Sequence, residues 1–242
     1  MSEMTDGHTV QSYNDELSHL HNQVLRIAAL SREQIRSAIT TLEDEDTEAA
    51  RDVVQNDDIL NQLDVEIDED IVRLIAKRQP MARDLREIIT VGKIVTDIER
   101  VGDEARKIAL LTINFYDNHS SAPNFAVVRD IIRMGEYVDG MLERAVRAFD
   151  EQDIGLALEV IAQHRELDNE FKSALRRLST YILEDSRLVG HAVEIVLGLR
   201  ALERIGGHAK NIGGYVVFLV KGMDVRHKSL ETVVAELKAA GY

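Results

Sequence analysis

The stretch Thr96-Asp-Ile-Glu-Arg-Val-Gly-Asp-Glu-Ala-Arg-Lys-Ile-Ala109 decides how the rest of the chain is interpreted, because a similar stretch follows 104 residues later. Leu199-Arg-Ala-Leu-Glu-Arg-Ile-Gly-Gly-His-Ala-Lys-Asn-Ile-Gly213 aligns with it without a gap and pairs Glu99 with Glu203. The repeat unit of a solenoid has about 20 to 50 residues, so a repeat of this length is a whole small domain. The 242-residue sequence therefore predicts two copies of one domain.

Composition restricts the classes of function open to the chain. There is no cysteine, which removes disulfides and thiolate metal sites and fits a reducing compartment. The formal charge of −14 argues against binding to nucleic acid or to an anionic lipid surface. No apolar run reaches the roughly 18 to 20 residues that cross a bilayer, and residues 1–10 lack the layout of a signal peptide. We therefore expect a cytoplasmic protein that binds no nucleic acid and does not insert directly into a membrane.

Apolar residues recur every three or four positions along most of the chain, which is the period of amphipathic helices. Pro80 ends the second of these helices, because its ring disfavours helical geometry at the residue before it. No segment shows the alternating period of a half-buried strand. The predicted fold is all-α, a tandem repeat of two antiparallel three-helix bundles. The predicted helices cover about 17–42, 47–76, 83–116, 125–149, 154–183, 187–220 and 229–240.

The polar segment 117–124 separates the two copies, and it contains one of the two prolines of the chain. We therefore expect the first bundle to span residues 12–117 and the second to span residues 123–225. Residues 226–242 are predicted to form a short C-terminal helix or tail. The copies fall out of step once, by three residues, in the loop between the second and third helix of each bundle.

Two glycines lie on the inward stripe of the third predicted helix, at Gly92 and Gly102. A glycine in a helix interior costs about 1 kcal/mol relative to alanine. Such a cost is compensated where another helix approaches the backbone closely, so we expect a close helix–helix contact here.

Carboxylates interrupt the apolar stripes of the second and third predicted helices. Glu99 stands where an apolar residue is expected, and Asp103 follows one turn later on the same face. The second helix carries Asp57 and Asp64 on its inward stripe, with Asn61 one turn from Asp57. A carboxylate in a bundle interior costs several kcal/mol unless it is paired, hydrogen-bonded or bound to a cation. An oxygen-rich cluster of this kind suits Mg, Mn, Fe or Ca.

The sequence also allows these acids to be accommodated without a metal, in two ways. The nearby Arg100, Arg106 and Lys107 could neutralise the carboxylates by forming ion pairs with them. Alternatively, a small rotation of the helices could leave the acids in water at the edge of the bundle, because helical phase drifts by roughly 20° per heptad.

The second copy offers a different set of ligands. Glu203 is kept, but Gly207 stands at the position of the second carboxylate of the third helix. On the preceding helix, His164 and Asp168 stand where the first copy has its Asp and Asn, and their spacing of four residues puts them on one face. Because the second copy has fewer oxygen ligands, we expect metal to bind the first bundle more tightly, or the first bundle alone.

Several segments in both halves are similar to those of one known family. In the order in which they occur, they resemble the PhoU family of bacterial phosphate-transport regulators, and the likeness runs from about residue 12 to about residue 230. The last segment is most similar to the proteobacterial members. The segments are Arg78-Gln-Pro-Met-Ala-Arg-Asp-Leu-Arg86, Asp97-Ile-Glu-Arg-Val-Gly-Asp-Glu-Ala105, Tyr181-Ile-Leu-Glu-Asp185, Arg200-Ala-Leu-Glu-Arg-Ile-Gly206 and Phe218-Leu-Val-Lys-Gly-Met-Asp-Val-Arg-His227.

The resemblance implies a function, partners and a metal. It implies a non-enzymatic cytoplasmic protein that restrains phosphate uptake and dampens the phosphate-starvation response. Such a protein would link the ATPase subunit of the phosphate ABC transporter to the phosphate sensor histidine kinase, form a homodimer, and reach the inner membrane through its partners. Some members carry multinuclear metal clusters, which implies a divalent or trivalent ion such as Fe, Mn, Mg or Zn. In the first copy, the spacings from Asp57 to Asn61 and from Glu99 to Asp103 match the metal motif of the family. Together with His164, Asp168 and Glu203 of the second copy, these four residues are the candidate metal ligands.

The chain departs from the family pattern in its second copy, where Gly207 and Gly214 replace two carboxylates that the family usually has. The alternative function, from a different class, is a di-iron carboxylate enzyme or metal store of the ferritin-like kind. That chemistry needs Glu-x-x-His on two helices, and the sequence has this motif once, at Glu16-Leu-Ser-His19. A purely structural helical scaffold is the third possibility. No nucleophile beside a base and no phosphate-binding loop is found, so nucleophilic catalysis has no support in the sequence.

Overall fold

The computed structural model describes residues 3–117, 125–226, 228–239 and 241, and these residues form helices and connecting turns with no β-strand among them. This confirms the predicted all-α class. The predicted linker at 117–124 lies outside the described residues from residue 118 on. In chain order the helices are α1 (Glu3–Glu43), α2 (Thr47–Arg78), α3 (Ala82–Tyr116), α4 (Phe125–Asp150), α5 (Ile154–Glu184), the 3-10 helix η1 (Ser186–His191), α6 (Ala192–Lys221) and α7 (Leu230–Ala239).

Some helix starts differ from those predicted. α1 begins at Glu3 rather than near residue 17, because the helix continues before its apolar stripe begins. α6 begins at Ala192 rather than at 187, since the residues before it wind as the tighter η1. Asp46 caps α2, whose predicted start at Thr47 is confirmed: Oδ1 of Asp46 accepts hydrogen bonds from the backbone N–H groups of Glu48 and Ala49, at 3.0 and 2.9 Å.

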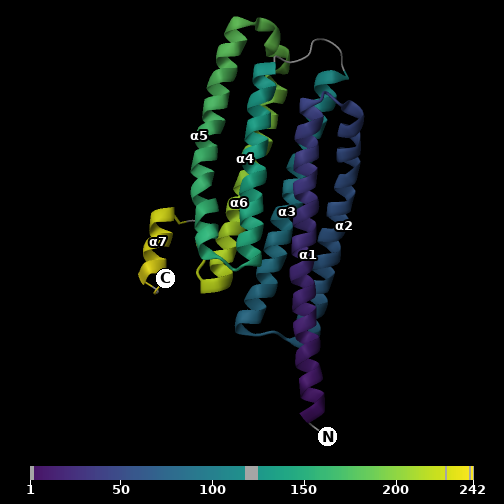
Figure 1. Cartoon of the computed structure of the whole chain (residues 1–242), viewed down its shortest axis with the longest axis vertical. Helices are drawn as coiled ribbons and strands as arrows, with labels where there is room; N and C mark the ends of the chain where they lie inside the picture. The colour runs from purple at the N-terminus through teal and green to yellow at the C-terminus, as the bar shows by residue number, and fades with distance from the viewer. Residues whose placement is uncertain (1–2, 118–124, 227, 240, 242) are drawn as a thin grey trace.

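The six long helices form two bundles that lie side by side, as predicted: α1, α2 and α3 in one, and α4, α5 and α6 in the other (Figure 1). Between the bundles α1 packs on α4 and α3 packs on α6, so that each helix meets its own counterpart in the repeat. Both pairs run antiparallel (Figure 1). The two copies are therefore related by a pseudo-twofold axis that passes between the bundles. α7 lies apart from both, beside α5.

Ion pairs and hydrogen bonds fix this antiparallel arrangement. Nε of Arg32 on α1 lies 2.9 Å from Oδ1 of Asp139 on α4. On the other pair, Nδ1 of His208 on α6 lies 2.6 Å from Oδ1 of Asp97 on α3. Because Asp97 is only 3 % exposed, its carboxylate is a buried polar link between these two helices.

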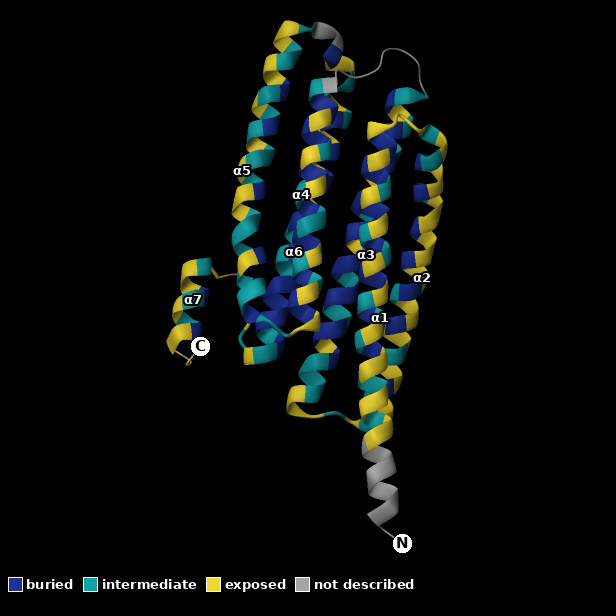
Figure 2. Ribbon diagram, viewed as in Figure 1, coloured by how far each residue is buried: buried dark blue, intermediate teal, exposed yellow. Residues whose placement is uncertain are grey.

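A single apolar core runs through both bundles. Ile98 of α3 and Ile205 of α6, which are both fully buried, belong to the same cluster as the inward stripes of α1, α2, α4 and α5. Figure 2 shows the buried residues facing between the helices and the exposed residues covering the outside. Burial of apolar surface contributes roughly 25 cal/mol per Å², so this shared core stabilises the two bundles as one unit.

Glycines allow the helices to approach at several contacts. A Cβ atom at Gly102 would collide with Leu60 of α2, which confirms the predicted close contact, and one at Gly206 would collide with Leu167 of α5. A Cβ atom at Gly213 would lie 2.9 Å from the backbone oxygen of Ala157. The last contact is the strictest, because a backbone oxygen in a helix cannot rotate away.

We predict that Gly213→Ala lowers the free energy of unfolding by about 1–3 kcal/mol, because the added methyl group forces α5 and α6 apart. The adjacent Gly214→Ala is a matched control, since its Cβ atom would meet only side-chain atoms at 3.7 Å. The control is expected to be neutral or to gain up to about 1 kcal/mol of helix propensity. Urea denaturation followed by circular dichroism measures both, and equal effects of the two substitutions would contradict this role of the close packing.

Candidate functional site

The predicted acids of the first bundle lie where α2 faces α3. Asp57 is buried, at 6 % exposure, and its Oδ1 accepts a hydrogen bond of 3.1 Å from Nε2 of Gln34 on α1. Asp64, Glu99 and Asp103 are half-buried, whereas Asn61 is exposed on the outside of α2. The structure therefore brings the carboxylates to one seam and places the predicted Asn ligand away from it.

These carboxylates repel one another. Burial raises the pKa of Glu99 above its usual value, and the negative charges of Asp103, Asp64 and Asp57 raise it further. Burial likewise raises the pKa of Asp64, and the charge of Asp68 adds to this effect. The positive charge of Arg100 lowers the pKa of Glu99 by less than these effects raise it, so the cluster is not fully compensated.

Basic side chains neutralise this cluster only in part. Nε of Arg106 lies 3.9 Å from Oδ2 of Asp57, at the limit of an ion pair. Lys107 instead pairs with Glu104, at 2.8 Å. Oδ1 of Asp64 and Oε1 of Gln34 are buried and have no hydrogen-bond partner among the described residues. Unpaired buried oxygens beside repelling carboxylates fit a bound cation, and an all-oxygen set of this kind suits Mg or Ca.

In the second bundle, α5 and α6 bring His164, Asp168 and Glu203 together. One ligand atom from each lies within 4.8 Å of the other two, and within the described part of the chain this is the one set of three His or acidic residues that does so. Nδ1 of His164 is 3.6 Å from Oδ2 of Asp168. Burial is the main effect that lowers the pKa of His164, which favours the neutral imidazole that ligates metals. One nitrogen and two carboxylates suit Mn, Fe or Zn.

The second set of candidate ligands is the more compact one, while tighter metal binding by the first bundle stays a prediction. The number of oxygen ligands in the sequence favoured the first bundle, but Asp57, Glu99 and Asp103 do not converge as closely as the second set does. Gly207 also has a different consequence from the one expected. A Cβ atom there would lie 3.7 Å from Nε2 of His164, so glycine leaves space beside the imidazole.

A buried network between α3 and α6 was not predicted from the sequence. Oδ1 of Asp97 accepts hydrogen bonds from Nδ1 of His208, at 2.6 Å, and from Nδ2 of Asn211, at 3.1 Å. Burial and the charge and hydrogen bond of Asp97 raise the pKa of Tyr215 to about 12. One signal in the sequence could have indicated this network. Asp97 has an apolar counterpart in the second copy, Ala201, so the carboxylate is specific to the first copy.

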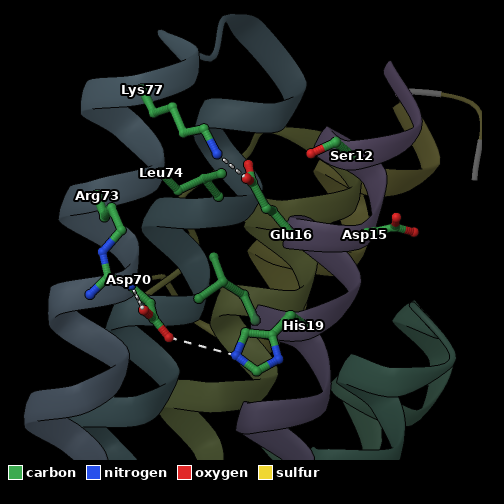
Figure 3. Close-up of a pocket in the computed structure, with 9 residues that line it drawn as sticks. Ser12, Asp15, Glu16, His19, Asp70, Arg73, Leu74 and Lys77 are labelled. Atoms are coloured by element: carbon green, nitrogen blue, oxygen red, sulfur yellow. Dashed lines mark hydrogen bonds and ion pairs between the residues drawn. The ribbon is translucent and has the colours of Figure 1, made fainter. Parts of the chain in front are cut away.

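A pocket between the N-terminal part of α1 and the end of α2 contains the motif on which the di-iron alternative depends (Figure 3). Oε1 and Oε2 of Glu16 each lie 2.7 Å from a cation, Lys77 and Arg78 respectively. Hydrogen bonds from Arg78 and Lys77 lower the pKa of Glu16 to about 2. His19 points instead towards Asp70, at 3.7 Å. A carboxylate already paired with two cations does not fit a di-iron ligand, which disfavours that alternative.

None of the described helices is both long and apolar enough to cross a membrane.

Comparison with known proteins gives a consistent result. The family model described as "PhoU domain" matches residues 24–112 and again residues 131–216. A protein of Pseudomonas putida named "Phosphate-specific transport system accessory protein PhoU homolog" is 41% identical over 231 residues, which cover 96% of this chain and 89% of that protein. The Escherichia coli K12 protein named "Phosphate-specific transport system accessory protein PhoU" is 32% identical over 220 residues, covering 91% of this chain and 90% of its own length.

Solved structures share the fold. The crystal structure of PhoU from Pseudomonas aeruginosa has a TM-score of 0.81 and 40% sequence identity, and the match covers 87% of this chain and 100% of that one. The phosphate transport system regulatory protein PhoU from Streptococcus pneumoniae has a TM-score of 0.79 at 23% identity, covering 88% of this chain and 99% of that one. The second match supports the fold alone.

We predict that Glu99→Gln raises the melting temperature of the metal-free protein at about pH 7.5. Folding raises the pKa of Glu99, so the folded state binds this proton more tightly than the unfolded state does. The associated stability is present at acidic pH and is lost as the pH rises through the raised pKa. The advantage of the variant should therefore shrink towards about pH 5. Thermal unfolding in a chelator, with the exposed Glu69→Gln as control, tests this. A variant less stable than the parent at neutral pH would mean that Glu99 is already compensated.

Proposed function

Because the chain belongs to the PhoU family, we propose that it is a non-enzymatic accessory protein of phosphate transport that restrains phosphate uptake and the phosphate-starvation response. The observation that supports this most is the PhoU domain itself, matched once in each bundle. The relatives that cover nine tenths or more of this chain carry names of accessory proteins of the phosphate-specific transport system. Fold alone does not imply function, so the proposal rests on this full-length similarity rather than on the helical bundle.

The finer part of the proposal concerns how such a protein regulates. We propose that it acts in the cytoplasm as an adaptor that contacts the ATPase subunit of the phosphate ABC transporter and the phosphate sensor histidine kinase. The two bundles present separate outer faces, on α2 and on α5, while α3 and α6 pack on each other between them. A rigid body with two outer faces can hold two partners at once. In this proposal the chain reaches the inner membrane through these partners and works as a homodimer.

The proposal includes metal binding. His164, Asp168 and Glu203 would hold a transition metal such as Mn, Fe or Zn between α5 and α6. Asp57, Glu99 and Asp103 would hold a hard cation such as Mg between α2 and α3, where the buried Oδ1 of Asp64 still lacks a partner among the described side chains. A bound cation would supply positive charge and join two helices in each bundle, and it has no part in a chemical reaction here.

Deletion of this protein is expected to leave phosphate-responsive genes expressed in phosphate-rich medium, because the proposed restraint on the kinase is then missing. A transcriptional reporter in the deletion strain measures this, and the wild-type gene supplied in trans should restore repression. Complementation with Glu203→Ala separates the two parts of the proposal, since it tests whether regulation needs the second metal site. Normal repression in the deletion strain would contradict the regulatory function.

Glu203→Ala is expected to lower the amount of bound transition metal about tenfold or more, because it deletes one of three converging ligands. The matched variant is Glu99→Ala combined with Asp103→Ala, which should leave transition metal in place and reduce binding of Mg. Elemental analysis of protein purified without chelator or a metal-affinity step measures both. Equal losses from the two variants would contradict the assignment of different metals to the two bundles, and a metal-free parent protein would contradict metal binding altogether.

A further inference from the structure

The seam between α3 and α6 contains a groove on one side of the pseudo-twofold axis. Its volume is about 340 Å³. Its floor is apolar and its rim carries charges from both helices. The residues that line it are Glu104, Lys107, Leu110, Leu111 and Asn114 of α3, and Glu194, Leu197, Gly198, Arg200, Ala201 and Arg204 of α6.

Two carboxylate oxygens in this groove lack partners. Glu104 is only 6 % exposed, and while its Oε1 accepts from Lys107 and Arg204, its buried Oε2 has no hydrogen-bond donor among the described residues. Oε2 of Glu194 is also buried and without a donor in the described part of the chain. A buried acceptor left unsatisfied costs about 1–3 kcal/mol. The groove is therefore set up to accept donors from outside.

The basic residues of the rim are already engaged. Arg204 and Lys107 both contact Oε1 of Glu104, and Nη1 of Arg200 lies 3.1 Å from Oε2 of Glu203. The buried groups of the groove that lack a partner among the described residues are two acceptors, Oε2 of Glu104 and Oε2 of Glu194, and these favour a ligand that donates hydrogen bonds, as a basic side chain does.

The pseudo-twofold axis relates this groove to a second position on the same seam, and that position is filled. There Tyr215 stands where the groove has Leu111, and Asp97 stands where the groove has Ala201. The chain segment that follows α6 covers it. Val225 is buried at 4 % exposure, and Cζ of Arg226 lies 5.9 Å from the centre of the Tyr215 ring. One half of the seam is thus closed by an apolar side chain followed directly by a basic one.

We propose that the open groove is a docking site for a segment of a partner protein that presents an apolar side chain next to an arginine or lysine. The apolar side chain would rest on Leu110 and Leu197, and the basic group would donate to Glu104 or Glu194. Leu197 and Val193 on the first turns of α6 are 63 % and 66 % exposed, so apolar surface continues beyond the groove and suits a polypeptide better than a small cation. The inference does not rest on the proposed regulation of phosphate uptake, and its test has no phosphate-dependent readout.

The probe is a fluorescein-labelled peptide with the sequence of residues 219–228 of this chain, the segment that closes the other half of the seam. Fluorescence anisotropy should show saturable binding to the full-length protein. Leu197→Glu and Glu104→Gln should each weaken binding by about tenfold or more, and so should the change Arg226→Glu in the peptide. The matched control is Val72→Glu on α2, a position of comparable exposure, which should leave binding unchanged.

Leu197→Glu changes a surface side chain, so it separates docking from folding, and thermal unfolding checks that Glu104→Gln is folded. Three outcomes would overturn the proposal. The peptide does not bind saturably, Leu197→Glu does not weaken its binding, or the peptide that carries Arg226→Glu binds as tightly as the unchanged peptide. Analytical ultracentrifugation of the parent and Leu197→Glu proteins tests whether a second copy of this chain occupies the groove instead. If the substitution dissociates a dimer, a second copy of this chain covers the groove and the proposal fails.

Discussion

The antiparallel packing of α3 on α6 is the constraint on which the rest of the structure depends. Each of these helices contacts the other two helices of its own bundle as well as its counterpart across the axis. Both helices therefore bury more residues than their neighbours do, and Gly102 and Gly206 permit the close approach of α2 and α5. The candidate metal ligands Glu99 and Glu203 lie on the remaining faces, towards α2 and α5. The position of both sites follows from how this one helix pair is packed.

The local pattern of the sequence predicted most of the fold. Apolar period, Pro80 and the repeat indicated the helices, their order and the faces that carry Glu99 and Asp103. These patterns do not determine how far one helix is shifted along its axis relative to its neighbour. This axial shift brings His164 close to Glu203, whereas the acids of the first bundle remain further apart.

Contacts across the axis were beyond sequence reasoning for a different reason. Asp97 and His208 are 111 residues apart, and each looks ordinary on its own helix. The repeat identifies the counterpart of each residue in the other copy, but it does not identify the residue that faces it across the interface. Only the antiparallel packing puts Asp97 opposite His208, and the same packing leaves Glu104 opposite Ala201. The two halves of the seam therefore differ in charge although the helices that build them are copies.

The pairing of Asp97 with His208 has a consequence for how a duplicated chain of this kind can arise. His208 is the counterpart of Glu104, so two identical copies of the first bundle, joined in the same way, would place Asp97 against Glu104 twice. Two buried carboxylates would then face each other at each of two places, which costs several kcal/mol per charge. Two copies of the second bundle would instead put His208 beside Ala201, with no acceptor. Each half is thus a poor partner for itself and a good one for the other. A pairing of two identical bundles in this geometry therefore requires different residues at these positions.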